Sequence, residues 1–400
     1  MKVQLNMKEI KCDVLVVGGG AAGSSAARSA ALNNARTLII EKNPNTVKSA
    51  CAEALTSSVL PLLPFKIPKA QLKWKIDGLK FYADGLSILR KGDLWEGFSI
   101  ERSETNPWMT NQALKAGAKL YTNTELIDLE CDDDFQVVKA IAEKNNEEIE
   151  IRPKIVIAAD GVNSTVANAL DLRKERKCSV AHITSYEMAN VKIDNPHLEQ
   201  IFFDDFTPKG FAYIFPKSSN RANVGVGSVL LKDETEKFFD EFMNFNVVKK
   251  QLNGGKMIAD RSGYAPVDYS LEKNVRGNVI FTGDVANQNI KPFIEGFIPG
   301  ILCGDIAGSC ASHFLKNNAK LEDYEKLIDA KFGEIFSFSD QILDFMLKIF
   351  EHKDREDYLL LLALCSDVVE FEKFDDFLVS PYDELREKLE KIISSKNWQH

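Results

Sequence analysis

A glycine-rich turn near the N-terminus constrains the fold of this chain more than any other stretch. Residues 14–17 form a short apolar run, as expected of a parallel strand that is buried on both faces. Gly18, Gly20 and Gly23 follow with G-x-G-x-x-G spacing, and an alanine-rich helix is predicted over residues 24–33. In such a turn the glycines permit a tight bend, the approach of a pyrophosphate, and close packing of helix on strand. The positive end of the helix dipole then favours phosphate, so the stretch predicts a dinucleotide site.

A second apolar strand, residues 37–40, ends in Glu41. This acid follows the glycines by about 20 residues, where a carboxylate can accept hydrogen bonds from a ribose diol. The alternative is an ordinary α/β turn with a surface glutamate. Because the motif follows a strand, opens a helix and is followed by this acid, dinucleotide binding is favoured.

Composition excludes several classes of function. The chain has 400 residues, enough for a large core and two or three structural units. Its net charge of −9 argues against a nucleic-acid partner and gives no general attraction to anionic membranes. The seven cysteines are scattered without a C-x-x-C pair and the five histidines are isolated, so no metal site is predicted. The cysteine usage predicts a reducing, cytoplasmic location, and any membrane contact is expected to be peripheral, on the inner face.

Two further apolar strands end in special turns. Residues 155–159 lead into Asp160 and Gly161, and residues 278–282 lead into Gly283 and Asp284. Ligands of open α/β sheets bind outside the carboxyl ends of the strands, so the three turns are expected to converge. Asp284 can then bond a ribityl hydroxyl, and a helix beginning after Gly296 can direct its positive end at the pyrimidine edge of a flavin.

The return of buried strands predicts a discontinuous nucleotide-binding domain. Short strands at 180–191, 200–203, 212–215 and 222–230 predict an antiparallel sheet that walls a substrate cavity. The expected domains are a nucleotide-binding domain over 1–75, 100–175 and 275–320, a substrate domain over 76–99 and 176–274, and a helical region over 321–400.

Several elements are predicted less directly from the pattern. Residues 42–58 are expected to be a loop, and helices are expected at 108–116, 234–249 and 298–314. The C-terminal tail is interpreted as four amphipathic helices packed on the core, with a membrane-surface or partner role as the alternative. These helices are predicted at 321–336, 339–350, 355–365 and 381–394.

The three turns together resemble the FAD-dependent enzymes of the para-hydroxybenzoate hydroxylase fold. The resemblance covers roughly residues 10–315 and implies a Rossmann-like FAD-binding domain, an antiparallel substrate sheet and a helical C-terminal region. By this resemblance Arg102 would face the ribose and phosphate side of FAD. The residues expected to bind the cofactor are Gly18, Gly20, Ala21, Ala22, Gly23, Glu41, Lys42, Cys51, Ala52, Arg102, Asp160, Gly161, Gly283, Asp284, Gly296, Phe297 and Ile298.

A narrower match resembles the geranylgeranyl reductase family, of the type that acts on archaeal digeranylgeranylglycerophospholipids. It rests on residues 210–216 (Gly-Phe-Ala-Tyr-Ile-Phe-Pro), on residues 223–227 (Asn-Val-Gly-Val-Gly), and on the cysteine loop from Lys48 and Ser49 to Glu53. The resemblance implies that reduced FAD delivers hydride to isolated prenyl double bonds of a lipid. The electron donor stays open among NAD(P)H, ferredoxin or another reductant.

Three residues are expected to carry this chemistry. Tyr213 and Phe215 alternate on one strand face and can line an isoprenoid channel, although they can equally be core aromatics. Cys51 can act as a redox or proton-relay residue, or it can be a small buried apolar group. An isolated alkene needs a dry pocket and a proton donor near the flavin, which these residues would supply.

The sequence departs from the family pattern at three places. Tyr213 replaces a tryptophan, Ala52 replaces a glycine, and residues 293–299 (Phe-Ile-Glu-Gly-Phe-Ile-Pro) replace a run of three glycines. Losing glycine removes freedom at positive φ and adds bulk. Two alternatives therefore stay open: an FAD-dependent aromatic hydroxylase, and a flavin- or lipid-binding protein without turnover.

Overall fold

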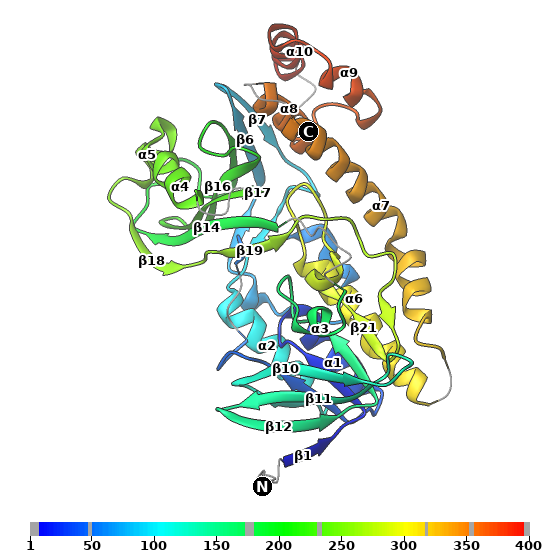
Figure 1. Ribbon diagram of the computed structural model, residues 1–400. Helices are drawn as coiled ribbons and strands as arrows, with labels where there is room; N and C mark the ends of the chain where they lie inside the picture. Colours follow the sequence, from blue (N-terminus) through cyan, green and yellow to red (C-terminus); the bar gives the residue numbers. More distant parts are fainter. Residues whose placement is uncertain are drawn as a thin grey trace.

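The computed structural model describes residues 8–46, 50–172, 180–229, 234–316, 319–351 and 356–395. The predicted loop residues Lys48 and Ser49, the predicted strand end at 230 and the predicted helix start at 355 lie outside these ranges. The α/β fold class is confirmed. Two large sheets occupy different parts of the molecule, and one long helix runs beside both (Figure 1).

A six-stranded sheet carries the glycine turn. Its strand order is β20-β21-β13-β2-β3-β9, and all neighbouring pairs except β20 with β21 run parallel. The central strands are buried along their whole length, which explains their continuous apolar sequences. The strands are β2 Val14–Val17, β3 Thr37–Ile40, β9 Lys119–Tyr121, β13 Ile155–Ala158, β20 Val275–Arg276 and β21 Val279–Phe281.

This sheet is the middle of three layers. Val14 and Val16 of β2 pack in one cluster with the helices α1 and α6, while Leu15 and Val17 face a four-stranded sheet on the other side. Successive strand residues point to opposite faces, so one strand serves both cores. The covering elements are α1 Ala21–Leu32, α2 Arg102–Lys115, α3 Thr165–Ala169, α6 Phe297–Leu315, η3 Gly283–Ala286, β1 Lys8–Lys11, β10 Thr124–Cys131, β11 Val137–Lys144 and β12 Glu147–Arg152.

An eight-stranded sheet forms the second part of the molecule. Its order is β18-β14-β17-β16-β15-β6-β7, with β19 also pairing with β14, and only β6 and β15 pair in parallel. Ala212 and Ile214 of β16 pack toward α4, whereas Tyr213 faces the C-terminal helices. The elements are β6 Gly78–Ala83, β7 Leu86–Arg90, β14 Val180–Ala189, β15 Leu198–Phe203, β16 Gly210–Ser218, β17 Arg221–Val229, β18 Lys256–Asp260, β19 Gly263–Pro266, α4 Thr235–Asn244 and α5 Asn246–Leu252.

The long helix α7, Asp323–Glu351, links the two parts. Tyr324 and Ile328 pack with α1 and α6, while Leu343 and Met346 pack against the eight-stranded sheet. A separate three-stranded sheet has the order β4-β8-β5. The remaining elements are β4 Ala54–Thr56, β5 Trp74–Ile76, β8 Gly97–Ser99, η1 Ser57–Leu62, η2 Lys69–Gln71, α8 Glu356–Cys365, η4 Phe371–Lys373, α9 Phe374–Leu378 and α10 Tyr382–Ser394.

The structure makes four corrections to the predicted elements. The two helices predicted at 321–336 and 339–350 form the single helix α7, since residues 337–338 do not interrupt it. The helix predicted at 234–249 is broken at Phe245, which adopts an extended backbone. The predicted loop 42–58 contains β4, which pairs with β8.

The fourth correction concerns the start of α2. The sequence predicted a helix only over residues 108–116, and the structure places Pro107 inside it. The helix instead begins at Arg102, whose backbone N–H donates to the Glu53 carboxylate at 2.7 Å. This long-range bond satisfies one of the N–H groups that the first turn of a helix leaves without a partner.

We predict that the contact between α1 and α6 tolerates no side chain at Gly308. A Cβ there would lie 2.0 Å from the Ala26 carbonyl oxygen, so α6 would have to move. Gly308→Ala should lower the free energy of unfolding by about 1–3 kcal/mol, measured by denaturant titration. Gly333→Ala in α7 is the control, where a Cβ meets only the flexible Asp329 side chain. A stabilising Gly308→Ala would contradict the packing described.

Candidate active site

One cavity of about 440 Å³ joins the two parts of the molecule. Its lining includes the turns that follow β2, β13 and β21, the cysteine loop, and one face of β16 and β17. Segments that lie far apart in the sequence therefore meet around one space, as expected at the carboxyl ends of parallel strands. Its size is in the range of pockets that bind cofactors and small molecules.

The glycine turn leaves an open approach to the start of α1. Gly18 has a positive φ of 98°, and a Cβ on it would lie 2.3 Å from the Ala159 oxygen. A Cβ on Gly23 would lie 1.9 Å from the Gly18 oxygen, so this residue lets the helix pack on the turn. Nothing lies within 4 Å of a Cβ on Gly20, the N-cap of α1, and no side chain caps the helix. A pyrophosphate fits this uncapped helix start.

Glu41 is held rigidly beside the turn. One carboxylate oxygen accepts the Gly19 N–H at 2.8 Å, and the other accepts two donors from Asn43, at 2.9 Å and 2.8 Å. The side chain is buried, and its carboxylate lines the cavity. The fixed carboxylate has the chemistry needed to accept further hydrogen bonds, and its contact with a ribose stays a prediction.

Two aspartates from different strands face the same cavity. Asp160 accepts the Val166 N–H at 3.0 Å through Oδ2, while its buried Oδ1 has no partner within the described ranges. Burial raises the pKa of Asp160. Burial also raises the pKa of Asp284, with Arg102 acting in the opposite direction. A ligand hydroxyl at these positions would satisfy buried oxygens that are otherwise costly.

Cys51 and Arg102 lie together on the cavity wall. The Cys51 sulfur accepts the Glu53 N–H at 3.3 Å and an Arg102 guanidinium N–H at 3.5 Å. Burial raises the pKa of the Cys51 thiol, although the Arg102 charge opposes this effect. Arg102 also donates to Asn106 at 2.7 Å and lies over the Phe297 ring, 4.3 Å from its centroid. Cys51 is therefore a protonated thiol with a fixed orientation.

Aromatic side chains of β16 form the far wall. Tyr213 lies against Gly225 on β17, where a Cβ would come within 2.5 Å of the tyrosine ring. Its hydroxyl donates to Ser185 at 2.9 Å, and the centroid of its ring is 5.1 Å from that of Phe215. Burial raises the pKa of Tyr213. Gly225 thus makes room for the Tyr213 ring.

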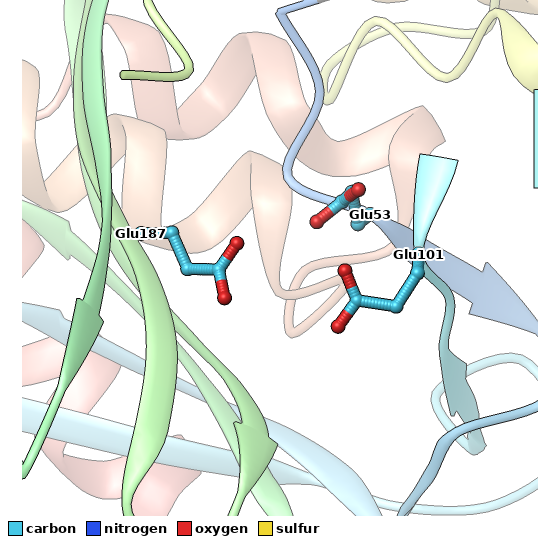
Figure 2. A group of neighbouring side chains, drawn as sticks. All are labelled: Glu53, Glu101 and Glu187. Carbon is cyan, nitrogen blue, oxygen red and sulfur yellow. The ribbon is translucent and has the colours of Figure 1, made fainter. Parts of the chain in front are cut away.

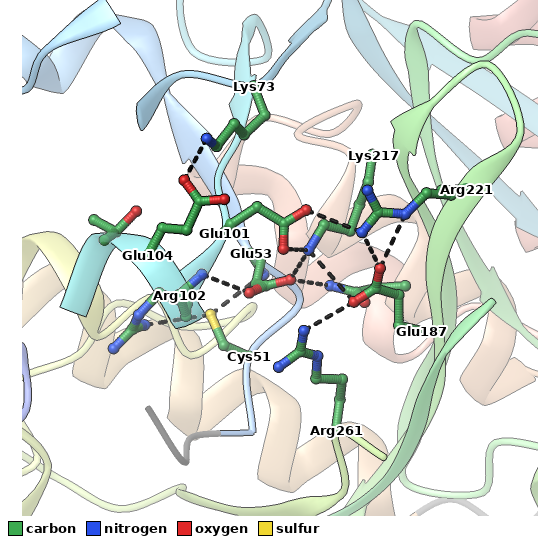
Figure 3. A network of polar contacts seen from close by, with 12 residues as sticks. Cys51, Glu53, Lys73, Glu101, Arg102, Glu104, Glu187, Lys217, Arg221 and Arg261 are labelled. Atoms are coloured by element: carbon green, nitrogen blue, oxygen red, sulfur yellow. Dashed lines mark hydrogen bonds and ion pairs between the residues drawn. The ribbon is translucent and has the colours of Figure 1, made fainter. Parts of the chain in front are cut away.

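A buried ion network lies behind the cysteine loop. Glu53, Glu101 and Glu187 bring their carboxylates within 4.8 Å of one another, a grouping that resembles a metal site (Figure 2). Lys217, whose side chain is fully buried, lies among them. It donates to Glu53 and to Glu101, the latter at 2.7 Å, and it lies 3.8 Å from Glu187 (Figure 3).

Two arginines balance the remaining negative charge of this network. Arg221 pairs with Glu187 and with Glu101, the latter at 3.1 Å, and Arg261 donates to Glu187 at 2.8 Å (Figure 3). Burial acts to raise the pKa of Glu187, but the hydrogen bonds from the two arginines outweigh it and lower that pKa. Three carboxylates therefore face three cations, and the ammonium group of Lys217 occupies the position that a metal would need.

The network holds the cysteine loop in place. Glu53 has a positive φ of 64°, which a non-glycine residue adopts only when its surroundings hold it there. Its carboxylate accepts the Arg102 N–H, the Lys217 ammonium and the Asn223 amide, the last at 2.9 Å. The position of Cys51, two residues earlier, depends on these bonds.

Nearly all residues expected at the site line this cavity. Two do not: Gly23 packs beneath the turn, and Ile298 packs in an apolar cluster with Ile301. The sequence analysis missed the ion network, and it missed Met346 of α7, which also lines the cavity. Met346 could not be recognised as a cavity residue from the sequence, because an apolar residue on an amphipathic helix is usually a core residue.

We predict that Lys217 stabilises the fold through the three carboxylates. Lys217→Met leaves buried negative charge with too few partners and should cost about 3–5 kcal/mol in the free energy of unfolding. Lys237→Met on the exposed side of α4 is the matched control and should change stability by less than about 0.5 kcal/mol. Equal stability of the two variants in denaturant titrations would refute this role.

Comparison with solved structures defines the class of protein. A Thermoplasma acidophilum protein described as geranylgeranyl bacteriochlorophyll reductase-like superposes with a TM-score of 0.80 and 25% identity, covering 96% of this chain and 100% of that chain. A triple mutant of the flavin-dependent brominase Bmp2 superposes with a TM-score of 0.68 at 16% identity, covering 95% of this chain and 99% of that chain, which shows a shared fold. The fold and site define an FAD-dependent oxidoreductase.

Sequence comparison then gives the family. The geranylgeranyl reductase catalytic domain model matches residues 180–263, and the model of glucose inhibited division protein A matches residues 13–212. Proteins named digeranylgeranylglycerophospholipid reductase from Methanococcus aeolicus and Methanocaldococcus jannaschii are 32% and 34% identical to this chain. Both alignments cover 78% of this chain, and they cover 79% and 81% of the relatives. The chain belongs to the digeranylgeranylglycerophospholipid reductase family, which confirms the predicted resemblance.

Proposed function

We propose that this protein reduces the double bonds of geranylgeranyl groups on a glycerophospholipid, using FAD. The observation that carries the proposal is the continuity of one cavity from the glycine turn to the aromatic wall of β16. A cofactor bound at the turn and a prenyl chain lying against Phe215 would share this cavity. Relatives with the same domains carry the reductase name, which supports the assignment.

The residues present fit FAD. The open helix start at Gly20 suits the pyrophosphate, and the fixed Glu41 carboxylate suits the adenosine ribose. The Asp160 oxygen that has no partner in the described part of the chain suits a ligand hydroxyl. When bound and reduced, the flavin supplies a hydride. The protein supplies the binding site, a dry environment and the proton that the second carbon of the alkene requires.

Cys51 is the proton donor in this proposal. Its thiol lines the cavity, and its raised pKa keeps the proton on sulfur at neutral pH. The Arg102 guanidinium and the Glu53 N–H fix the direction of the sulfur. The aromatic rings of Tyr213 and Phe215 exclude water from the same space and hold the prenyl chain.

The function is tested by anaerobic incubation of the FAD-loaded protein with dithionite and a geranylgeranylated glycerophospholipid. Mass spectrometry should show the addition of two hydrogen atoms for each double bond reduced. An unchanged lipid under these conditions would contradict the proposal. Rapid NAD(P)H oxidation stimulated only by a phenol would favour aromatic hydroxylation instead.

Replacing Cys51 separates catalysis from cofactor binding. Cys51→Ala should lower the turnover number by about 10²-fold, the usual contribution of a general acid, and leave the FAD content unchanged. Cys131→Ala is the control because this cysteine is exposed on β10. Turnover of Cys51→Ala at the wild-type rate would exclude Cys51 as the donor.

We also propose that the protein meets its lipid as a cytoplasmic, peripheral membrane protein. Within the described ranges no helix has the length and apolar character needed to cross a bilayer. The six cysteines in the same ranges form no disulfide bond. Leu94 and Val379 are 71% and 82% exposed, and the net charge is −9. Contact through apolar side chains predicts sedimentation with uncharged vesicles that is insensitive to salt; binding only to anionic vesicles at low salt would contradict it.

The electron donor is a further part of the proposal. The flavin needs a reductant for each turnover, and the candidates are NAD(P)H, ferredoxin or another donor. Gly225 and Gly227 are the only other closely spaced glycines that resemble a nucleotide motif, but in the structure both lie within β17. Reduction of the bound flavin by each donor under anaerobic conditions identifies the one used.

A further inference from the structure

The cavity meets the N-terminal ends of two helices, and the two ends differ. The start of α1 at Gly20 has no side-chain cap and nothing within 4 Å of its open side. The start of α6 is occupied. One oxygen of Glu295 accepts the N–H of Phe297 at 2.9 Å and the N–H of Ile298 at 3.0 Å. The 19-residue helix therefore directs its positive end into a carboxyl group of its own chain.

The backbone holds Glu295 in this position. Its N–H and C=O form a pair of hydrogen bonds with Ile290, both at 2.9 Å. Ile294, just before it, has a positive φ of 56°, a conformation that an unrestrained isoleucine avoids. This uncommon backbone conformation places the Glu295 carboxyl group at the start of α6.

The segment around Glu295 runs between the two ends of the cavity. The Phe293 ring contacts Phe211 of the aromatic wall, with 6.1 Å between centroids. At the other end Gly300 lies beside Ala22 of α1, since a Cβ on it would lie 3.6 Å from the Ala22 methyl group. An FAD molecule with its phosphates at α1 and its ring toward the aromatic wall must pass the start of α6.

Glu295 has charged neighbours of both signs in the cavity. It lines the cavity together with Asp284, Cys51 and Arg102. Burial raises the pKa of Glu295, while the N–H bonds from Ile298 and Phe297 and the Arg102 charge oppose the rise and the Asp284 charge adds to it. One carboxyl oxygen accepts both N–H groups, so these groups are not free to face a ligand and less of the positive potential of this helix end reaches the cavity.

We propose that Glu295 sets the charge state and the reduction potential of the flavin bound here. A free helix start beside the flavin ring stabilises the negative charge that the ring gains on reduction, and Glu295 cancels that stabilisation. The reduced flavin is then a stronger hydride donor, which suits an alkene without an activating group. The inference rests on the proposed FAD site and concerns a position where the sequence departs from the glycines of its family.

The test compares the full-length wild type with Glu295→Gln and Glu295→Gly, each loaded with FAD. Sulfite adds to oxidised flavin when positive potential lies near the pyrimidine edge, and the adduct bleaches the visible spectrum. Glu295→Gly should bind sulfite about tenfold more tightly than the wild type, the size of one helix-terminus interaction in a partly buried site. Its reduction potential should shift upward, and Glu295→Gln should lie between the two.

The control is Glu236→Gln, which removes a carboxylate from the exposed first turn of α4 and should leave both readouts at wild-type values. The inference would be overturned if the wild type and both Glu295 variants bound FAD and showed equal sulfite affinity and equal reduction potential. The proposed FAD site would not be affected by that result. A wild-type chain that takes up no FAD would overturn the FAD site itself, and the inference with it. Because Gln preserves the size of the side chain, Glu295→Gln decides the matter if Glu295→Gly does not fold.

Discussion

The close approach of α6 to α1 is the contact on which the site depends. Gly304 and Gly308 lie against the carbonyl oxygens of Ala22 and Ala26, where a Cβ would be 2.3 Å and 2.0 Å away. No larger residue permits this distance between helices. The contact brings the first turns of two helices that lie more than 250 residues apart in the sequence into the same cavity. One is open to an anion, and the other is closed by Glu295.

Buried charge supports the other side of the cavity. Taking three carboxylates and three cations out of water is costly, and such a cluster adds little to stability compared with apolar packing. The effect of the cluster is to fix the positions of backbone segments and side chains at the cavity. Glu53 caps α2, pairs with Lys217 and fixes the loop that carries Cys51 (Figure 3). The fold thus combines an apolar wall for a hydrocarbon chain with a polar frame that keeps one thiol and one guanidinium in place.

The parts of the site that follow local rules could be predicted from the sequence. The glycine turn has a fixed spacing at Gly18, Gly20 and Gly23, and the buried strands are continuous apolar runs. The residues at the expected cofactor site could therefore be predicted. Lys217 was not, because a lysine after Phe215 and Pro216 has the pattern of a strand end in solvent, and its partners lie as far as 164 residues away in sequence. Glu295 was visible only as a departure from glycine, since its hydrogen bonds to the helix start depend on the path of residues 290–295.

The central claim is that one cavity holds both the flavin and the prenyl chain. The most direct test is a crystal structure of the full chain with FAD and a geranylgeranyl ether lipid bound. We expect the pyrophosphate over Gly20 and the prenyl chain against Phe211 and Phe215, in contact with the flavin ring. A lipid bound outside this cavity, or a flavin ring turned away from the β16 wall, would contradict it.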